Sequence, residues 1–281
     1  MTIHRFHLVN VFAETPLSGN PLAVFEDGSG LDDATMLAMA RQLNLPEIAF
    51  FLPPTQAADT RIRIFNTAAE STFVGHPTLG SAHVWNIIRN QANQRIALET
   101  HIGIVPVWHE NDIWTFQAKT PTYRACNLSS QQLAAILGLQ VKDITGTALF
   151  VSTGAEQLVV PLASRDAIMR CAPKAYVLEQ FAANRNGQAA VYVWHRDEAL
   201  VSVRFFHTDR GSLIEDHGTG SACANLGGWL LANGVPRPIR LDIRQGHTIN
   251  RLSTIRLEVD QARHIYVGGR VAYLGAGELM L

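Results

Sequence analysis

The sequence predicts an α/β (α+β) protein of two pseudo-symmetric halves, each a sheet or barrel around one central helix. Three observations lead to this fold class. One segment of the chain occurs twice, short strand patterns separated by turn residues dominate, and each half has a single long apolar helical stretch. The helices are too few and too unevenly placed for a doubly wound fold.

The duplicated segment reads RIFNTAAESTFVGHPTLGSA at residues 63–82 and RFFHTDRGSLIEDHGTGSA at residues 204–222. Both copies open with Arg, an apolar residue, Phe, a polar residue and Thr, and both end in Gly-Ser-Ala ahead of an apolar helical stretch. The second copy follows the first by 140 or 141 positions, about half of the 281 residues. We therefore interpret the chain as two related halves, each with a strand, a loop and the start of a buried helix.

The first half alternates strand and helix patterns. Asp32 or Asp33 can cap a helix whose apolar residues recur at helical spacing, and Asn44 and Pro46 end that helix. Pro77 suits the first turn of a second helix, because its missing N–H costs nothing there. The expected elements are a strand at 3–13, a turn-rich loop at 14–21, extended structure at 22–25, a helix at 33–44, strands at 48–51 and 60–66, a helix from about 77 to 90, and two or three strands within 95–119.

A break at Thr120-Pro121-Thr122 marks the expected domain boundary. It gives a first domain of residues 1–119, completed by a C-terminal strand at 276–281, and a second domain of residues 120–275. Ser129 and Gln132 form a capping-box pattern for a helix that ends at Gly138 and echoes the helix at 33–44. The further elements expected are strands at 147–152 and 156–161, two short helices within 164–185, two strands within 189–207, a helix from about 219 to 232, and short strands that end in glycine-rich turns at 268–269 and 275–277.

The composition excludes several kinds of partner. Hydrophobic residues make up 47% of the chain, charged residues 17%, and the net charge is −1, so nothing indicates binding to nucleic acid or to an anionic membrane. There is no membrane-spanning run of apolar residues, and the N-terminus lacks the features of a signal peptide. Three widely spaced cysteines, Cys126, Cys171 and Cys223, form no disulfide or zinc pattern. We expect a reduced, cytoplasmic protein with no metal.

Chemistry is expected at the two joints where a loop enters a central helix, around Gly75 and around Gly220. Each joint exposes backbone N–H groups and the positive end of a helix dipole, an arrangement that binds carboxylate or phosphate oxygens. Glu47, His76 and Asp216 are the acid/base candidates. In the alignment of the two copies His76 falls opposite Asp216, and Glu47 heads a buried strand, where desolvation would raise a carboxyl pKa into a useful range.

Four segments carry a resemblance to a known family: FAETPLSGNPLAVF, LPEIAFF, ESTFVGHPTLGSA and EDHGTGSA. In this order they resemble the signature segments of PhzF-like, phenazine biosynthesis-type isomerases, whose fold is similar to that of diaminopimelate epimerase. The resemblance runs from about residue 5 to residue 270. It implies two similar α/β domains, each a barrel-like, mostly antiparallel sheet around a central helix, with the site between them. It also implies proton transfer without a cofactor and a homodimer.

The resemblance also implies roles for individual residues. The family's acid/base glutamate falls on Glu47, and its histidine and aspartate fall on His76 and Asp216. The residues implied to bind the substrate are Gly19, Asn20, Gly75, Gly220 and Ser221. Two positions depart from the family pattern: His217 replaces a proline, and Pro77 stands where alanine is common. The family's best-known substrate, a dihydro-hydroxyanthranilate, therefore does not transfer directly to this chain.

These observations favour a cofactor-independent isomerase that moves a proton between carbons of a small carboxylic acid. Two alternatives stay open: an amino-acid racemase or epimerase of the same fold that uses carboxylate and imidazole, and a non-catalytic protein that binds a small anion. A two-thiol racemase is disfavoured because the first joint has no cysteine and Cys223 fits a buried helix position. HExxH, GxSxG and a strand–GxGxxG–helix unit are all missing, so metal hydrolysis, serine hydrolysis and dinucleotide binding have no support.

Overall fold

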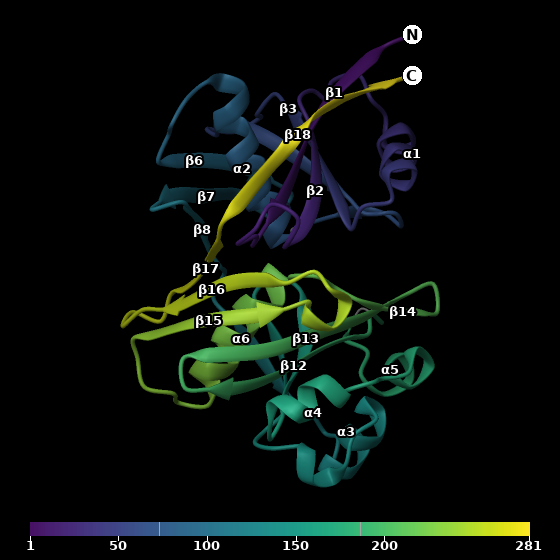
Figure 1. Cartoon of the computed structure of the whole chain (residues 1–281), viewed down its shortest axis with the longest axis vertical. Helices are drawn as coiled ribbons and strands as arrows, with labels where there is room; N and C mark the ends of the chain where they lie inside the picture. Colours follow the sequence, from purple (N-terminus) through teal and green to yellow (C-terminus); the bar gives the residue numbers. More distant parts are fainter. Residues whose placement is uncertain (73, 186) are drawn as a thin grey trace. The chain divides into compact units, whose positions relative to one another are not determined.

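The structure, a computed structural model, describes residues 1–72, 74–185 and 187–281 (Figure 1). It contains two compact units. Unit 1 comprises Met1–Gln117 and Gly268–Leu281, and unit 2 comprises Ala118–Val267. The sequence-based division placed residues 268–275 in the second half. The contacts assign them to unit 1, because the last strand of the chain pairs with the first strand along its whole length.

In the described part of unit 1, strands outnumber helices. Its helices are α1 (Asp33–Leu43) and α2 (Gly75–Arg89). Its strands are β1 (Ile3–Val11), β2 (Asn20–Phe25), β3 (Glu47–Leu52), β4 (Thr60–Phe65), β5 (Glu70–Ser71), β6 (Arg95–Thr100), β7 (Gly103–Glu110), β8 (Ile113–Gln117) and β18 (Val271–Met280).

Unit 2 repeats this mixture with additional short helices. The helices are α3 (Ser130–Leu137), α4 (Arg165–Arg170), α5 (Ala175–Phe181) and α6 (Gly220–Ala232), with 3₁₀ turns at Val141–Asp143 and His247–Ile249. The strands are β9 (Thr122–Ala125), β10 (Leu149–Ser152), β11 (Glu156–Pro161), β12 (Ala190–Asp197), β13 (Leu200–Asp209), β14 (Ser212–Glu215), β15 (Ile239–Gln245) and β16 (Ser253–Val259). Strand β17 (Ile265–Gly269) leads from unit 2 back into unit 1.

The two units share one order of strand pairing. In unit 1, β1–β2, β3–β4 and β6–β7 are antiparallel, while β2–β3 and β4–β6 are parallel. In unit 2, β10–β11, β12–β13 and β15–β16 are antiparallel, while β11–β12 and β13–β15 are parallel. The duplication therefore extends through both sheets, and the predicted fold class of pseudo-symmetric, mostly antiparallel halves is confirmed.

The strand order corrects one expected correspondence between helices. Helix α1 connects the parallel strands β2 and β3, and the helices that connect the equivalent parallel strands β11 and β12 are α4 and α5. Helix α3, predicted to echo α1, comes before β10 and has no counterpart in unit 1. Ser129 and Gln132 do form the predicted capping box, but such a box is a local feature that any helix can use.

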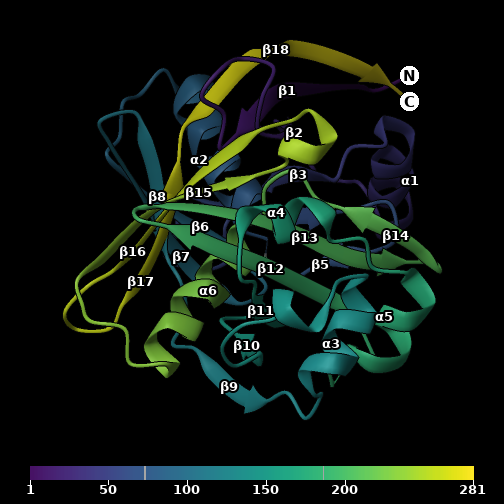
Figure 2. The ribbon, with the colours of Figure 1, turned by 60° about the horizontal axis from the view of Figure 1, so that its bottom comes forward.

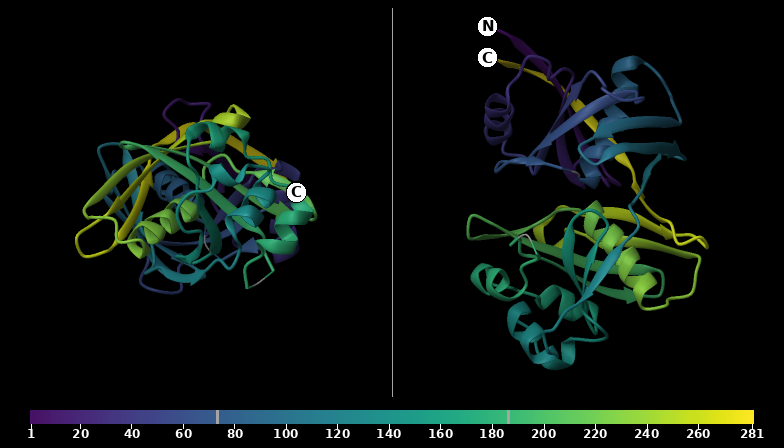
Figure 3. Two further views of the ribbon diagram at one scale, coloured as in Figure 1. Left: turned by 90° about the horizontal axis from the view of Figure 1, so that it is seen from below. Right: turned by 180° about the vertical axis from the view of Figure 1, so that it is seen from behind.

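Each unit surrounds one buried helix. Helix α2 contacts β1, β2, β3, β6, β7, β8 and β18. Helix α6, the yellow-green helix in Figure 3, contacts β9, β10, β11 and β16. Gly80 lets α2 approach the sheet, because a Cβ there would lie 2.5 Å from the Leu22 side chain. Both helices are apolar, yet no helix among the described residues has the length and hydropathy needed to cross a membrane.

The first residue of each repeat copy anchors the following strand. Arg63 forms a two-pronged ion pair with Glu70 (2.8 and 2.5 Å), and Arg204 forms one with Glu215 (2.9 and 2.7 Å). Each guanidinium also lies over the ring of the phenylalanine two residues further on, at 5.0 and 4.6 Å from the centroid. A bidentate Arg–carboxylate pair fixes geometry as well as adding stability, so the loop before each central helix starts from a fixed strand pair.

Helices α3, α4 and α5 lie together on one side of unit 2, while α6 lies separately (Figure 2). They bury a cluster of apolar side chains against one face of the sheet. Among its members are Leu133, Ile136, Phe150, Leu158, Ile168, Leu178, Val191, Val193 and Phe206. All members of this cluster belong to unit 2, and none of them lies in α6.

The glycine-rich end of the chain is strand, so the predicted turns at 268–269 and 275–277 are wrong. Residues 271–280 pair with β1, and the two strands run side by side to the chain termini in Figure 1. These glycines permit close packing rather than turning. A Cβ at Gly277 would lie 2.7 Å from the Phe6 ring, and one at Gly268 would lie 2.6 Å from the Thr115 side chain.

Candidate active site

The first half-site is the set of candidate residues around the N-terminal end of α2. It comprises Gly19, Asn20, Glu47, Gly75 and His76. The residue before the helix, Val74, has an apolar side chain and cannot cap it, and Pro77 has no N–H to satisfy. The Thr78 hydroxyl donates to the Val74 carbonyl oxygen at 2.9 Å, so it does not cap the helix either. By contrast, α1, α3 and α4 are capped by the side chains of residues 32, 129 and 164.

Glu47 and His76 face each other within this half-site. Glu47 is the first residue of β3, and its side chain is 17% exposed, whereas the His76 side chain is only 2% exposed. His76 Nε2 lies 3.4 Å from Glu47 Oε2. A carboxylate and an imidazole this close can hold a proton between them, and the partial exposure of Glu47 leaves its carboxylate open to a ligand.

Gly19 and Asn20 lead into the strand beside Glu47. Strands β2 and β3 are parallel with Leu22 opposite Glu47, so the turn and the carboxylate lie at the same edge of the sheet. Gly19 has φ of +81°, and a Cβ there would lie 2.4 Å from the Val11 carbonyl oxygen. Only glycine fits this turn. Asn20 is fully buried.

The second half-site lies at the N-terminal end of α6. It comprises Asp216, His217, Gly220 and Ser221. Thr219 precedes the helix but does not cap it. Its hydroxyl donates to Asp216 Oδ2 at 2.5 Å, while Asp216 Oδ1 accepts the His217 N–H at 2.8 Å. The Ser221 hydroxyl accepts a hydrogen bond from the Gln157 amide at 3.2 Å. The first N–H groups of α6 therefore have no side-chain cap and can take up an anion.

The two central helices begin at different positions within their repeat copies. Helix α2 begins at Gly75, five residues ahead of the Gly-Ser-Ala of its copy, whereas α6 begins at the Gly220 of its own Gly-Ser-Ala. As a result His76 lies in the first turn of a helix, while Asp216 lies in the loop before one. The alignment that placed these two residues opposite each other holds for the sequence but not for their positions relative to the helices.

Sequence analysis did not identify Gln245, which holds the second half-site together. Gln245 is fully buried at the end of β15. Its Oε1 accepts the Thr219 N–H at 3.1 Å, and its Nε2 donates to the Asp216 carbonyl at 3.0 Å and to the Thr219 hydroxyl at 2.8 Å. One signal was present. Strand β15 alternates Ile239, Leu241 and Ile243 on its buried side, and Gln245 takes the next buried position with a polar side chain.

A second buried amide supports the same joint. Asn225 is fully buried in α6, where its Oδ1 accepts from the backbone N–H and the hydroxyl of Thr153, each at 2.8 Å. Its Nδ2 donates to Gln157 Oε1 at 2.8 Å, and Gln157 in turn donates to Ser221. This chain of hydrogen bonds fixes the orientation of the Ser221 hydroxyl beside the helix start.

Cys223 and His83 lie in the central helices, but neither has the properties of an acid/base or nucleophilic group. Cys223 is fully buried in α6, and burial raises the pKa of its thiol well above the usual range, so it is not a thiolate nucleophile. His83 accepts a hydrogen bond from the Trp114 indole at 3.1 Å, and burial lowers its pKa to about 4. Within residues 1–72, 74–185 and 187–281, no three His, Cys, Asp or Glu side chains are grouped to hold a metal ion.

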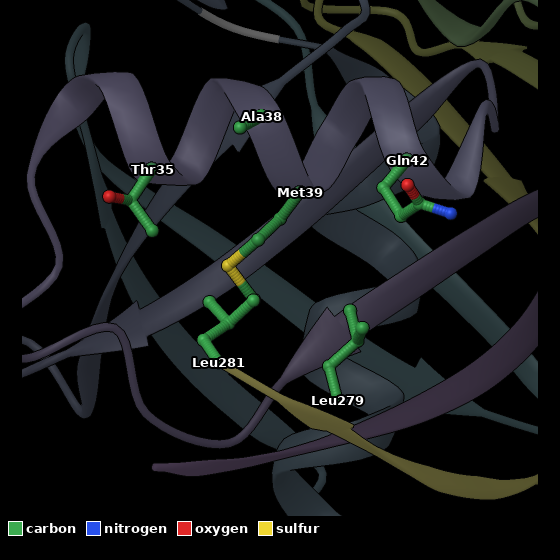
Figure 4. Close-up of a pocket in the computed structure, with 6 residues that line it drawn as sticks. All are labelled: Thr35, Ala38, Met39, Gln42, Leu279 and Leu281. Atoms are coloured by element: carbon green, nitrogen blue, oxygen red, sulfur yellow. The ribbon is translucent and has the colours of Figure 1, made fainter. Parts of the chain in front are cut away.

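One pocket lies away from both half-sites, between α1 and the end of β18 (Figure 4). Its volume is about 180 Å³, and its lining residues are Thr35, Ala38, Met39, Gln42, Leu279 and Leu281. The lining side chains are mostly apolar, and none of them is titratable. This pocket has none of the features that acid/base chemistry requires.

Comparison with known proteins defines the class of this chain. It is 38% identical, over the whole chain and 96% of the relative, to an uncharacterized isomerase of Pasteurella multocida. It is 33% identical, over 92% of both chains, to trans-2,3-dihydro-3-hydroxyanthranilate isomerase of Pseudomonas aeruginosa. The crystal structure of a PhzF-family phenazine biosynthesis protein from Bacillus anthracis has the same fold, with a TM-score of 0.87 at 23% identity over all of both chains. The chain is thus an enzyme of the isomerase class.

The family follows from a match that covers nearly the whole sequence. Residues 9–277 match the family described as phenazine biosynthesis-like protein. The chain belongs to this family, and the resemblance seen in its four sequence segments is confirmed.

Proposed function

We propose that the two half-sites bind one small carboxylic acid jointly and isomerise it by moving a proton between two of its carbons, without a cofactor. The observation that carries this proposal is that both central helices start without a side-chain cap, each beside a carboxylate and an imidazole. Helices α1, α3 and α4 have Asp or Ser caps, whereas α5 also starts without a side-chain cap but has no such acid/base pair beside it among the described residues. Uncapped N–H groups next to acid/base groups fit an anion that reacts.

In this proposal Glu47 takes the proton from carbon and returns it at another position. His76, 3.4 Å from Glu47, stabilises the ionised carboxylate before the transfer and shares the proton after it. The N–H groups at Gly75, Gly220 and Ser221 hold the substrate carboxylate and favour the negative charge that develops on the substrate as the proton leaves. Gly19 and Asn20 shape the wall beside Glu47, and Asp216 orients the substrate from unit 2.

The proposal includes a homodimer as the working assembly, on the resemblance to the family. It leaves the substrate open within a class: a small, cyclic or branched carboxylic acid with an acidic C–H bond. The relative from Pseudomonas aeruginosa is named for trans-2,3-dihydro-3-hydroxyanthranilate, which makes that compound the first probe. A carboxylate, an amino group and an allylic C–H bond make it chemically suited to proton transfer of this kind.

The test follows turnover of this probe in D₂O by NMR, in wild type and in Glu47→Gln. Loss of general acid–base catalysis should reduce turnover by at least about 10²-fold. Glu26→Gln is the matched control, because Glu26 also pairs with a histidine in unit 1, at 2.8 Å from His7 Nε2, but lies away from either helix start. The control should retain turnover within about threefold, the ordinary scatter among surface variants with intact chemistry.

Asp216→Asn tests whether the two units act on the same molecule. If they do, this variant in unit 2 and Glu47→Gln in unit 1 should both impair turnover of the same probe. A loss under threefold in Glu47→Gln would assign the base to another residue. Equal binding by wild type and Glu47→Gln, with no C–H exchange in either, would instead identify a binding protein without catalysis.

A further inference from the structure

His7 of β1 connects an acidic and a phenolic side chain through its two ring nitrogens. Its Nε2 lies 2.8 Å from Glu26 Oε1, and its Nδ1 lies 3.1 Å from the hydroxyl oxygen of Tyr273. The side chain of His7 is only 8% exposed, whereas Tyr273 is 42% exposed. A buried imidazole thus lies between a carboxylate and the phenol of an exposed tyrosine, and all three residues belong to unit 1.

Three neighbouring strands bring these side chains together. Strand β1 carries His7 and pairs with β2 on one side and with β18, which carries Tyr273, on the other. Glu26 directly follows the last residue of β2, and its N–H donates to the Arg5 carbonyl oxygen at 3.0 Å. The first half-site includes Asn20, the first residue of β2, so Glu26 lies at the opposite end of that strand.

A β-bulge places Tyr273 on the same face of the sheet as His7. After residue 8 the register between β1 and β18 shifts by one, so that Val9 is opposite Tyr273 and Leu274 is the extra residue. In an unbroken register Tyr273 would be opposite Asn10, and its side chain would point to the other face. Because Val9 shares a face with the residue two positions earlier, the bulge creates the contact between the phenol and the imidazole.

The carboxylate of Glu26 determines which nitrogen of His7 carries the proton. An ionised carboxylate can only accept a hydrogen bond, so His7 Nε2 donates to it. In the neutral ring the lone pair is then on Nδ1, which accepts a hydrogen bond from the Tyr273 hydroxyl. The imidazole is therefore in position to take the phenolic proton, and Glu26 stabilises the imidazolium that results. A nucleophile, its base and a residue that orients the base are arranged in this way in enzymes that form covalent intermediates.

Tyr123 provides a comparison within the same chain. It also lies in a strand, β9, and is 41% exposed, so its access to solvent matches that of Tyr273. No hydrogen bond among the described residues joins its hydroxyl to an imidazole. A phenol is almost fully protonated at neutral pH and is a weak nucleophile without a base beside it. Tyr273 should therefore react faster than Tyr123, although the two are equally exposed.

We propose that Tyr273 is a nucleophile that accepts an acyl group from activated esters, with His7 as its base and Glu26 as the residue that positions His7. The donor is an ester with a good leaving group, because a phenol attacks only an activated carbonyl carbon readily. The reaction is separate from the isomerisation proposed above, since none of the three residues belongs to either half-site. It makes Tyr273 a site of covalent modification on β18.

The transfer balances without an oxidant or a cofactor. The Tyr273 hydroxyl oxygen forms a bond to the carbonyl carbon of the ester while its proton moves to His7 Nδ1. The bond between that carbon and the leaving oxygen then breaks, and the leaving oxygen takes the electron pair of this bond and the proton from His7. The products are an acyl-tyrosine and the free alcohol, and His7 and Glu26 return to their starting states.

The experiment treats the full-length protein with p-nitrophenyl acetate at neutral pH. Peptide mapping by mass spectrometry measures the rate of acetylation at Tyr273 and at Tyr123 in the same sample. The variant is His7→Gln, which keeps a polar side chain but removes the base. The matched control is His101→Gln, because His101 also pairs with a carboxylate in unit 1, that of Glu70 at 2.8 Å. Melting temperature reports whether each variant is folded.

We expect acetylation of Tyr273 in wild type to be at least about 10²-fold faster than that of Tyr123, the scale of one general base. His7→Gln should remove this difference, and His101→Gln should retain it. Similar rates at the two tyrosines in wild type would overturn the inference, whether or not His7→Gln folds. A fast rate at Tyr273 that a folded His7→Gln leaves unchanged would overturn it as well. Neither result bears on the proposed function, which depends on other residues.

Discussion

Replacing Gln245 with leucine removes the hydrogen bonds that hold the loop before α6. The side chain of Gln245 is fully buried and makes three of them, two to Thr219 and one to the backbone of Asp216. Leucine has a similar size, so the substitution leaves the packing nearly unchanged and deletes the polar contacts. The Thr219 N–H and the Asp216 carbonyl would then be buried without this partner.

The size of the effect follows from those two orphaned groups. A buried donor or acceptor that loses its partner costs about 1–3 kcal/mol, and the leucine recovers part of that by burying apolar surface. We expect Gln245→Leu to lower the free energy of unfolding by about 3 kcal/mol. Because the lost contacts position Asp216 and the start of α6, turnover should fall more than stability alone explains.

Urea unfolding of Gln245→Leu and wild type measures this difference, and turnover is measured well below the midpoint. Gln261→Leu is the control, since Gln261 makes one exposed hydrogen bond to the Arg237 carbonyl at 3.0 Å and should change stability by no more than about 0.5 kcal/mol. A loss below about 1 kcal/mol in Gln245→Leu would show that Thr219 and Asp216 find other partners, and the argument for Gln245 as the support of the half-site would be refuted.

Two further predictions concern stability. Gly19→Ala should lower the free energy of unfolding by more than about 2 kcal/mol, because a Cβ would meet the Val11 carbonyl oxygen at 2.4 Å. Gly30 has the same φ of +81° but no atom within 4 Å of a Cβ, so Gly30→Ala should lower it by only about 1 kcal/mol; equal losses in urea unfolding would contradict this. The pKa of His83 is about 4 in the folded state, below its unfolded value of 6.5, so the unfolded chain binds the proton first as pH falls. The free energy of unfolding should therefore be highest above pH 6.5 and fall by about 2 kcal/mol between pH 6.5 and pH 5. Urea unfolding across this range should show that His83→Gln removes this pH dependence and that His4→Gln retains it.

Local sequence signals predicted the fold where short-range physics decides it. Asp32 and Ser129 cap their helices as their side chains allow, and Asn44 ends α1 in the left-handed conformation that asparagine tolerates. The repeat, which is visible without any structure, gave the two halves and the two central helices. These features depend on residues that are neighbours in the sequence.

Features that depend on distant partners were missed. Gly275 and Gly277 look like turn residues, and only the pairing of β18 with β1 and the ring of Phe6 explains why they lie in a strand. The capping pattern at Ser129 does not show which strands α3 connects, so its correspondence to α1 was assigned wrongly. Gln245 carried a signal, a polar residue at a buried alternating position, but its partners in the loop before α6 come from a different part of the chain.

The pairing of β18 with β1 has a consequence for biosynthesis. Unit 2 is one continuous stretch, Ala118–Val267, so it can complete its sheet as soon as the ribosome has released that stretch. Unit 1 begins first and finishes last, since the nascent β1 has no partner on one side until residues 271–280 emerge. During that interval the open edge of β1 can pair with a strand of another chain.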